Sequence, residues 1–151
     1  MSKVQVSTHI DAPRDEVWVA VADFGQIANF NPSVSESHLT GEANQGEGAT
    51  RHCSLTLAGA SVEERVVDWQ EGASYTVEIY KSSRVPVLTN AHGTIALADD
   101  GGGTKATMVI EYDTKYGPIG KLMDRMAIRG QNTKAAGLVV AGLKHYVETG
   151  E

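Results

Sequence analysis

Hydrophobic and polar residues alternate with a period of two along most of this chain, a pattern typical of strands with one buried face. The alternating segments are separated by turns rich in glycine, asparagine and aspartate. We predict seven strands, at residues 3–10, 34–39, 49–57, 61–69, 74–82, 89–98 and 104–116. Their close succession indicates a single antiparallel sheet.

A helical spacing of three to four residues replaces this alternation in two places. After the first strand, Asp11 is placed to cap a helix whose first turn contains Pro13, and a second short turn follows Gly25. Near the C-terminus, residues 119–147 predict a helix about 40 Å long, enough to cross the whole sheet. The expected fold is α+β: a curved seven-stranded antiparallel sheet with two short helices after strand 1 and one long C-terminal helix over a cavity. We expect residues 1–151 to form one domain.

The period of two also predicts which side chains point into that cavity. For residues 61–69 two faces remain open, one with Val62, Glu64 and Val66 and the other with Arg65, Val67 and Trp69. The residues expected to contact a ligand are Trp18, Phe24, Cys53, Leu55, Tyr75, Val77, Ala91, Met108, Tyr112, Met126, Gly130 and Gly137.

If the face with Glu64 is the inner one, Arg51 and Glu64 lie on adjacent strands and point into the same cavity. A buried arginine costs free energy unless it is paired, so Glu64 is its natural partner. One interpretation is functional: Arg51 holds a substrate oxygen and Glu64 transfers a proton. The other interpretation is an ion pair that only fixes the register of the strands.

The long helix contains unusually many small residues, including Gly130, Gly137 and Gly142. A glycine inside a helix costs about 1 kcal/mol relative to alanine. The missing side chains either leave room for a ligand or allow close packing against strands or a neighbouring subunit. The apolar stripe of this helix is predicted at Leu122, Met123, Met126, Leu138, Val139, Leu143 and Tyr146.

Composition and charge limit the classes of partner that the protein is expected to bind. A net charge of −6 opposes binding to nucleic acid or to anionic membranes. No apolar run approaches the ~20 residues of a membrane-spanning helix, so we expect no membrane insertion. The single cysteine, Cys53, cannot form an internal disulfide and fits a small buried hydrophobe in a reducing compartment, which favours a cytoplasmic location. The five histidines show no metal-ligand spacing, and no metal or organic cofactor is implied.

Five segments carry a resemblance to a known family: IDAPRDEVWVAVADFG (10–25), NPSV (31–34), GEGATRH (46–52), VEERVVDW (62–69) and YTVEI (75–79). They resemble the START-like helix-grip superfamily (SRPBCC), and within it the bacterial polyketide cyclase/dehydrase and lipid-transport family. The resemblance extends over the entire chain. It implies the helix-grip fold rather than one reaction, because the family includes ligand carriers, receptors and cyclases.

A further resemblance concerns Arg51 and Glu64. Plant enzymes similar to lachrymatory-factor synthase carry a matching arginine and glutamate that line the cavity and take part in proton transfer. The resemblance implies that Arg51 anchors an oxyanion and that Glu64 is a general acid/base. Those enzymes have an aromatic hydroxyl where this chain has Ala91, so Tyr75 or Tyr112 would have to supply it.

Three functions follow from these features. The first is binding of a small hydrophobic molecule of lipid, isoprenoid or aromatic polyketide type. The second is a cofactor-free polyketide cyclase, dehydratase or isomerase that uses Arg51 and Glu64. The third is a ligand-gated protein-interaction module, with residues 81–90 around Pro86 as a gate. An edge strand or the glycine-rich helix also offers a surface for a homodimer.

Overall fold

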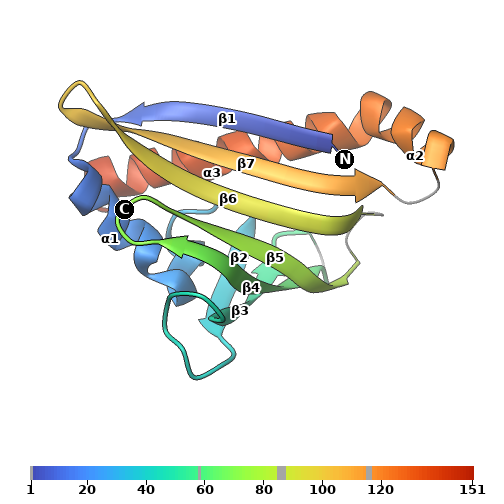
Figure 1. The fold of residues 1–151 in the computed structure, drawn as a ribbon, viewed down its shortest axis with the longest axis horizontal. Coiled ribbons are helices and arrows are strands. Elements are labelled where there is room, and N and C mark those ends of the chain that lie inside the picture. Colours follow the sequence, from blue (N-terminus) through green and yellow to red (C-terminus); the bar gives the residue numbers. More distant parts are fainter. Residues whose placement is uncertain (1, 58, 85–87, 115–116) are drawn as a thin grey trace.

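Seven strands form one antiparallel sheet in the order β1-β7-β6-β5-β4-β3-β2 in the computed structural model (Figure 1). The structure describes residues 2–57, 59–84, 88–114 and 117–151. The strands are β1 (Ser2–Ile10), β2 (Val34–Leu39), β3 (Thr50–Leu55), β4 (Ser61–Gln70), β5 (Ser74–Ser83), β6 (Leu88–Asp100) and β7 (Gly103–Thr114). All seven predicted strands are confirmed, although β3 is shorter than expected and residues 115–116 lie outside the described part.

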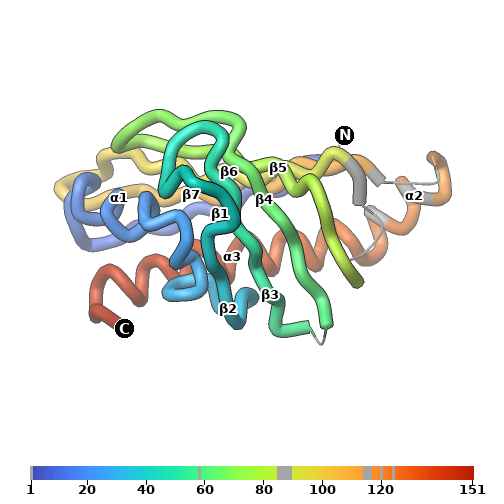
Figure 2. Tube along the Cα trace, turned by 90° about the horizontal axis from the view of Figure 1, so that it is seen from below, coloured from blue at the N-terminus to red at the C-terminus, as the bar shows by residue number. Residues whose placement is uncertain are grey.

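The helices pack on one side of this curved sheet. Two short ones follow β1, the α-helix α1 (Arg14–Ala22) and the 3₁₀-helix η1 (Phe24–Asn29). The C-terminal helix has three parts: α2 (Gly117–Met123), the π-helical η2 (Asp124–Ile128) and α3 (Arg129–Thr149). Figure 2 shows α3 running beneath the sheet, with β2 and β3 curling down towards it. This is the predicted grip of a curved sheet on a long helix.

The start of α1 differs from the prediction. Pro13 occupies the N-cap position, and no described side chain caps the helix. The backbone N–H of Asp11 instead donates to Glu148 Oε2 at 2.8 Å, which ties the end of β1 to the end of α3. Asp11 therefore joins two elements that are far apart in sequence, a role that local pattern does not reveal.

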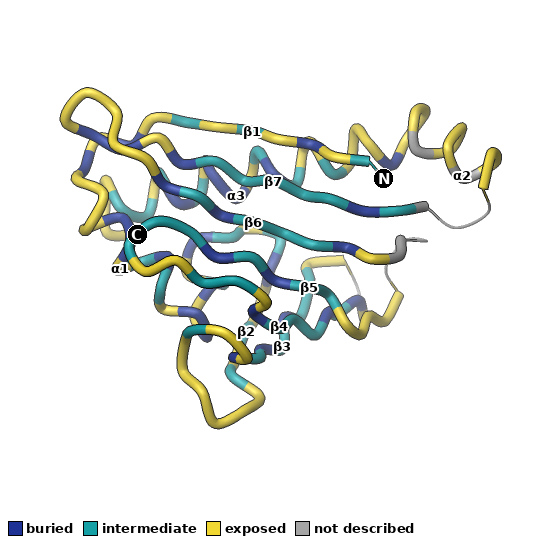
Figure 3. Tube along the Cα trace, viewed as in Figure 1, coloured by how far each residue is buried: buried dark blue, intermediate teal, exposed yellow. Residues whose placement is uncertain are grey.

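The buried face of the C-terminal helix also differs from the predicted stripe. Val139 and Leu143 are buried as expected, together with Val140, whereas Met126 is 77% exposed. The other exposed members of the stripe are Leu122, Met123 and Leu138. Figure 1 and Figure 3 show why the apolar residues in the first turns of the C-terminal helix are exposed. There α2 extends past the end of the sheet, so its apolar positions have no strand to pack on.

An irregular register in β4 settles which face of this strand points inward. Val66 pairs with Val77, but the next paired residue of β4 is Asp68, opposite Thr76. The extra residue shifts the alternation, because side chains point to opposite faces with a period of two. Glu64 before the shift and Trp69 after it therefore both reach the core side. The predicted face with Val62, Glu64 and Val66 points inward, and of the alternative face only Trp69 does, since Val67 is exposed.

Within the described residues, no helix is long and apolar enough to cross a membrane.

Candidate functional site

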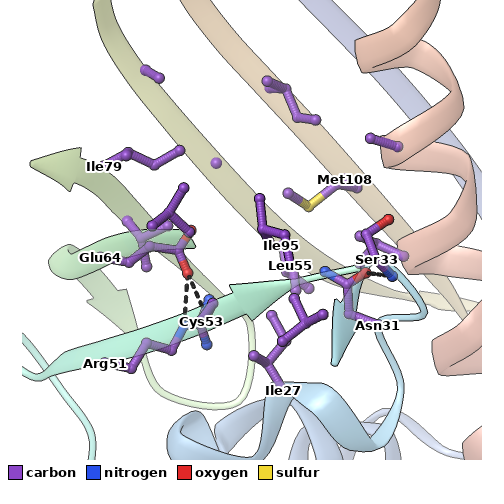
Figure 4. A pocket seen from close by; sticks show the side chains of 18 of the residues that line it. Ile27, Asn31, Ser33, Arg51, Cys53, Leu55, Glu64, Ile79, Ile95 and Met108 are labelled. Atoms are coloured by element: carbon purple, nitrogen blue, oxygen red, sulfur yellow. Dashed lines mark hydrogen bonds and ion pairs between the residues drawn. The ribbon is translucent and has the colours of Figure 1, made fainter. Parts of the chain in front are cut away.

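A cavity of about 230 Å³ lies between the concave face of the sheet, η1 and α3 (Figure 4). Its wall is mostly apolar, as expected for a site that accepts a hydrophobic molecule. Eight of the predicted site residues line it: Arg51, Cys53, Leu55, Glu64, Tyr75, Val77, Ala91 and Met108. Strands far apart in the sequence thus supply one wall, as the period of two predicts.

The other predicted site residues lie elsewhere. Met126 and Gly130 are exposed on η2 and α3, beyond the cavity. Gly137 faces β1, since a Cβ built on it would lie 4.0 Å from Val6 Cγ1. Tyr112 is fully buried in a separate cluster with Ile128. The period of two places Tyr112 on the correct face, but it lies beyond the end of the cavity.

Trp18 and Phe24 are core residues behind the cavity wall. The indole of Trp18 packs edge-on against Trp69 and donates from Nε1 to Glu71 at 2.9 Å. The ring of Phe24 lies beneath the Arg51 guanidinium, whose Cζ is 4.0 Å from the ring centroid. Phe24 therefore supports a cavity residue and does not line the cavity itself.

Sequence reasoning misses three polar residues of the wall, Asn31, Ser33 and Asn132. The sequence marks Asn31 only as a turn residue before Pro32, and its Oδ1 accepts from the Ser33 N–H at 3.0 Å. Asn132, Ala135 and Val139 follow one another at helical spacing and line the cavity from α3. In the sequence, this helical spacing is the feature that could have identified the cavity-lining residues of α3. The glycines of α3 do not line the cavity.

The predicted pair is present at one end of the cavity. Arg51 and Glu64 are direct neighbours across β3 and β4, and Arg51 Nε donates to Glu64 Oε1 at 2.8 Å. Arg51 is only 2% exposed and Glu64 13%. A cation this deeply buried needs an opposite charge and further acceptors, because desolvation is otherwise too costly.

Two more acceptors complete the environment of Arg51. Its Nη1 donates to the backbone oxygen of Phe24 at 3.0 Å and to the Tyr75 hydroxyl at 3.2 Å. The guanidinium thus joins η1, β3, β4 and β5 at a single point. A side chain held at this many points fixes the positions of the surrounding elements, and the same side chain lines the cavity.

These contacts set the protonation states. Burial by itself lowers the pKa of Arg51, but the attraction of Tyr75, Glu64 and Cys53 in their ionised forms outweighs it, so the pKa lies above its usual value. Burial, followed by the charge of Glu64, raises the pKa of the Cys53 thiol to about 12. Burial also raises the pKa of Tyr75. At neutral pH the site therefore presents a guanidinium, a phenol and a thiol.

Glu64 has hydrogen-bonding capacity that the pair with Arg51 does not use. Its Oε1 accepts from Arg51 and, at 3.5 Å, from Cys53 Sγ. No hydrogen bond within the described residues reaches its Oε2. A protonated thiol beside a carboxylate is a poor nucleophile. The site can therefore accept a hydrogen bond or a proton at Glu64, and it is poorly suited to covalent chemistry at Cys53.

No group of three or more His, Cys, Asp and Glu side chains comes together as a metal site in the described ranges. His52 and Glu63 lie on the strand face opposite Arg51 and Glu64, where His52 Nδ1 is 2.6 Å from Glu63 Oε1.

Comparison with known proteins extends this picture. A family model described as polyketide cyclase / dehydrase and lipid transport matches residues 1–148. In a comparison with curated proteins, none matches the chain.

Solved structures show the same fold. A protein from Thermus thermophilus is 15% identical with a TM-score of 0.80, and 99% of each chain is covered. A START superfamily protein from Mycobacterium smegmatis is 13% identical with a TM-score of 0.73, again over 99% of each chain. DynU16, a protein of the dynemicin biosynthetic locus, is 21% identical with a TM-score of 0.71 and covers 100% of this chain and 49% of its own.

Proposed function

This chain belongs to the polyketide cyclase / dehydrase and lipid transport family, and we propose that it binds a small hydrophobic molecule in the cavity between sheet and α3. One observation carries the proposal: a mostly apolar cavity of about 230 Å³ with a few polar groups in its wall, Arg51, Glu64 and Tyr75 on one side and Asn31, Ser33 and Asn132 on the other. Such a site buries an apolar body and orients it through a few polar contacts.

The cavity narrows the class of ligand. Its volume is below the ~300–1,000 Å³ of pockets that hold drug-sized molecules. A compact aromatic or short isoprenoid molecule therefore fits better than a lipid with two long chains. We expect the ligand to carry one oxygen that accepts from the Tyr75 hydroxyl or donates to Glu64 Oε2.

A cavity-filling variant tests the proposal. Ala135 lines the cavity from α3, whereas Ala141 is exposed on the same helix, so Ala135→Leu and Ala141→Leu form a matched pair. Binding of the fluorescent apolar probe 1-aminoanthracene is measured by titration. We expect Ala135→Leu to weaken binding at least ~10-fold, because the added methylenes occupy the ligand volume, and Ala141→Leu to bind like wild type. Equal binding by both variants, or no binding by wild type, would contradict the proposal.

The second candidate is a cofactor-free cyclase, dehydratase or isomerase. The observation that favours it is Glu64 Oε2, which accepts no hydrogen bond from the described residues. In this reading Arg51 stabilises negative charge on a substrate oxygen while Glu64 takes up a proton. Glu64→Gln keeps the shape of the site and removes the base. An enzyme loses turnover in this variant and still binds ligand, whereas a carrier releases its ligand unchanged in wild type and variant alike.

A further inference from the structure

An apolar patch covers the outer face of the first turns of the C-terminal helix. We define it as Ile119, Leu122, Met123 and Met126, all exposed. Ile119, Leu122 and Met123 share one face of α2 by their spacing of three and four residues, an arrangement that normally packs on a core, and Met126 follows in the π-helical η2. Here the residue that reaches the core is Ile128, which is buried against Ala91 and Tyr112. Exposed apolar surface of this kind marks an interaction site.

Basic residues accompany this patch. Lys121 in α2, Arg125 in η2, and Arg129 and Lys134 at the start of α3 are all exposed. They are four of the 13 lysines and arginines in a chain whose net charge is −6. With Asp124 included, residues 117–134 carry a net charge of +3 on a protein that is otherwise acidic. The surroundings of this segment attract anions even though the molecule as a whole repels them.

The apolar patch and the basic residues beside it together indicate the chemistry of the partner. Apolar side chains flanked by lysine and arginine are the features of a helix that lies in a membrane interface. A nucleic acid would not cover aliphatic side chains, because it needs stacking and phosphate contacts. A second copy of this chain, placed symmetrically, would bring the two basic clusters together, which opposes association.

We propose that α2 and η2 dock the protein on the surface of an anionic phospholipid membrane. The apolar patch enters the boundary between headgroups and acyl chains, and the four basic residues contact the anionic headgroups. The proposal differs from the expectation drawn from net charge alone, because screening limits the charges that act on a surface to those within about 8 Å of it at physiological salt.

The position of the docking helix relates it to the cavity. Figure 1 shows α2 projecting beyond the end of the sheet, away from α1. One turn after Ile128, Asn132 and Ala135 already line the cavity. A docked protein therefore holds this end of the cavity towards the bilayer. The docking itself requires no bound ligand, so it can be tested whether or not the cavity binds one.

Vesicle sedimentation tests the proposal with the full chain. We expect wild type to sediment with vesicles of phosphatidylcholine and phosphatidylserine at 7:3, to stay in solution with pure phosphatidylcholine, and to dissociate at 0.5 M NaCl. Leu122→Glu with Met126→Glu should lower the partition coefficient at least ~10-fold by removing apolar contact. Lys121→Glu with Arg125→Glu should do the same by removing electrostatic attraction.

Matched controls separate the patch from general effects. Val19→Glu with Leu57→Glu replaces two apolar residues that are exposed elsewhere, and Lys3→Glu with Lys105→Glu makes the same change in net charge. Both controls should sediment like wild type. Thermal unfolding shows that each variant is folded, and equilibrium sedimentation without vesicles gives its oligomeric state.

Three outcomes overturn the proposal. The first is that the wild-type protein does not sediment with anionic vesicles. The second is that the control variants lose vesicle binding as strongly as the patch variants do. The third is a wild-type dimer that the patch variants convert to monomer without any vesicle binding, which assigns the patch to a second copy. Binding of 1-aminoanthracene by the patch variants keeps a failure of docking distinct from a failure of the cavity.

Discussion

Arg51 is a buried cation whose counter-charge comes from the neighbouring strand. The guanidinium is held by Glu64, the Phe24 carbonyl and the Tyr75 hydroxyl, so four elements depend on one side chain. A buried ion pair adds little stability compared with a well-packed apolar pair, but removing one partner leaves a charge without compensation. The two residues should therefore behave as a unit.

We expect Glu64→Gln to lower the free energy of unfolding by about 2–3 kcal/mol, since Arg51 stays charged and buried. Arg51→Met should cost a similar amount because it leaves Glu64 unpaired. The double variant Arg51→Met with Glu64→Leu should lose no more than the larger single variant. Urea unfolding of the wild type, the two single variants and the double variant measures these free energies as a double-mutant cycle. If the losses of the two single variants simply add up in the double variant, the pair does not act as a unit.

Outside the cavity, Glu71 is a second residue that links several others through its side chain. Its carboxylate accepts from Trp18 Nε1 at 2.9 Å and from Trp69 Nε1 at 2.7 Å. These hydrogen bonds, that of Trp69 first, hold the pKa of Glu71 below its usual 4.5. The two indoles are the only tryptophans of the chain. Tryptophan emission therefore reports on this carboxylate.

The sign of the pH dependence follows from that lowered pKa. The folded state binds a proton less readily than the unfolded state, so the stabilisation by Glu71 is present above pH 4.5 and is lost as the pH falls through the lower folded pKa. We expect Tm to fall on acidification from pH 6 to pH 3.5 by less in Glu71→Gln than in wild type, with a change in tryptophan emission only in wild type. Glu42→Gln, in an exposed turn, serves as the control and should follow wild type.

At the scale of elements, the glycines of α3 have different environments. A Cβ on Gly142 would overlap the backbone oxygen of Phe30, so this glycine lets the helix approach the turn after η1. A Cβ on Gly137 would meet Val6 Cγ1 at an ordinary 4.0 Å. Close packing, the second of the two predicted interpretations, is therefore correct for Gly142, and neither glycine opens space for a ligand.

Alanine substitution at these two positions should have opposite effects. Gly142→Ala is expected to lower the free energy of unfolding by at least ~2 kcal/mol, because the Phe30 backbone would have to move. Gly137→Ala should raise it by up to about 1 kcal/mol through helix propensity alone. Thermal and urea unfolding of the pair measure the difference. Equal destabilisation by both changes would mean that helix-to-sheet packing is tight along all of α3.

Other elements show why local pattern predicts some features and misses others. Alternation in β3, β5, β6 and β7 is sufficient to place Cys53, Tyr75, Ala91 and Met108 in the cavity wall, because the pleat leaves a side chain only two directions. In β4 one extra residue after Val66 reverses that choice, and no residue type announces it. The apolar positions of α2 follow the helical rule and are exposed, because the sheet ends before they do.

For the whole molecule, the sequence by itself determined the seven strands, the long helix and the family, and it predicted the pairing of Arg51 with Glu64 for one of the two faces left open in residues 61–69. These features depend on periodicity, turn residues and the cost of burying a charge, all of which act between neighbours along the chain or across one strand pair. Only the tertiary structure decided where the cavity ends, which helical residues line it and which apolar residues stay uncovered. Those properties depend on how far the sheet extends and how closely α3 approaches it, and long-range packing sets both.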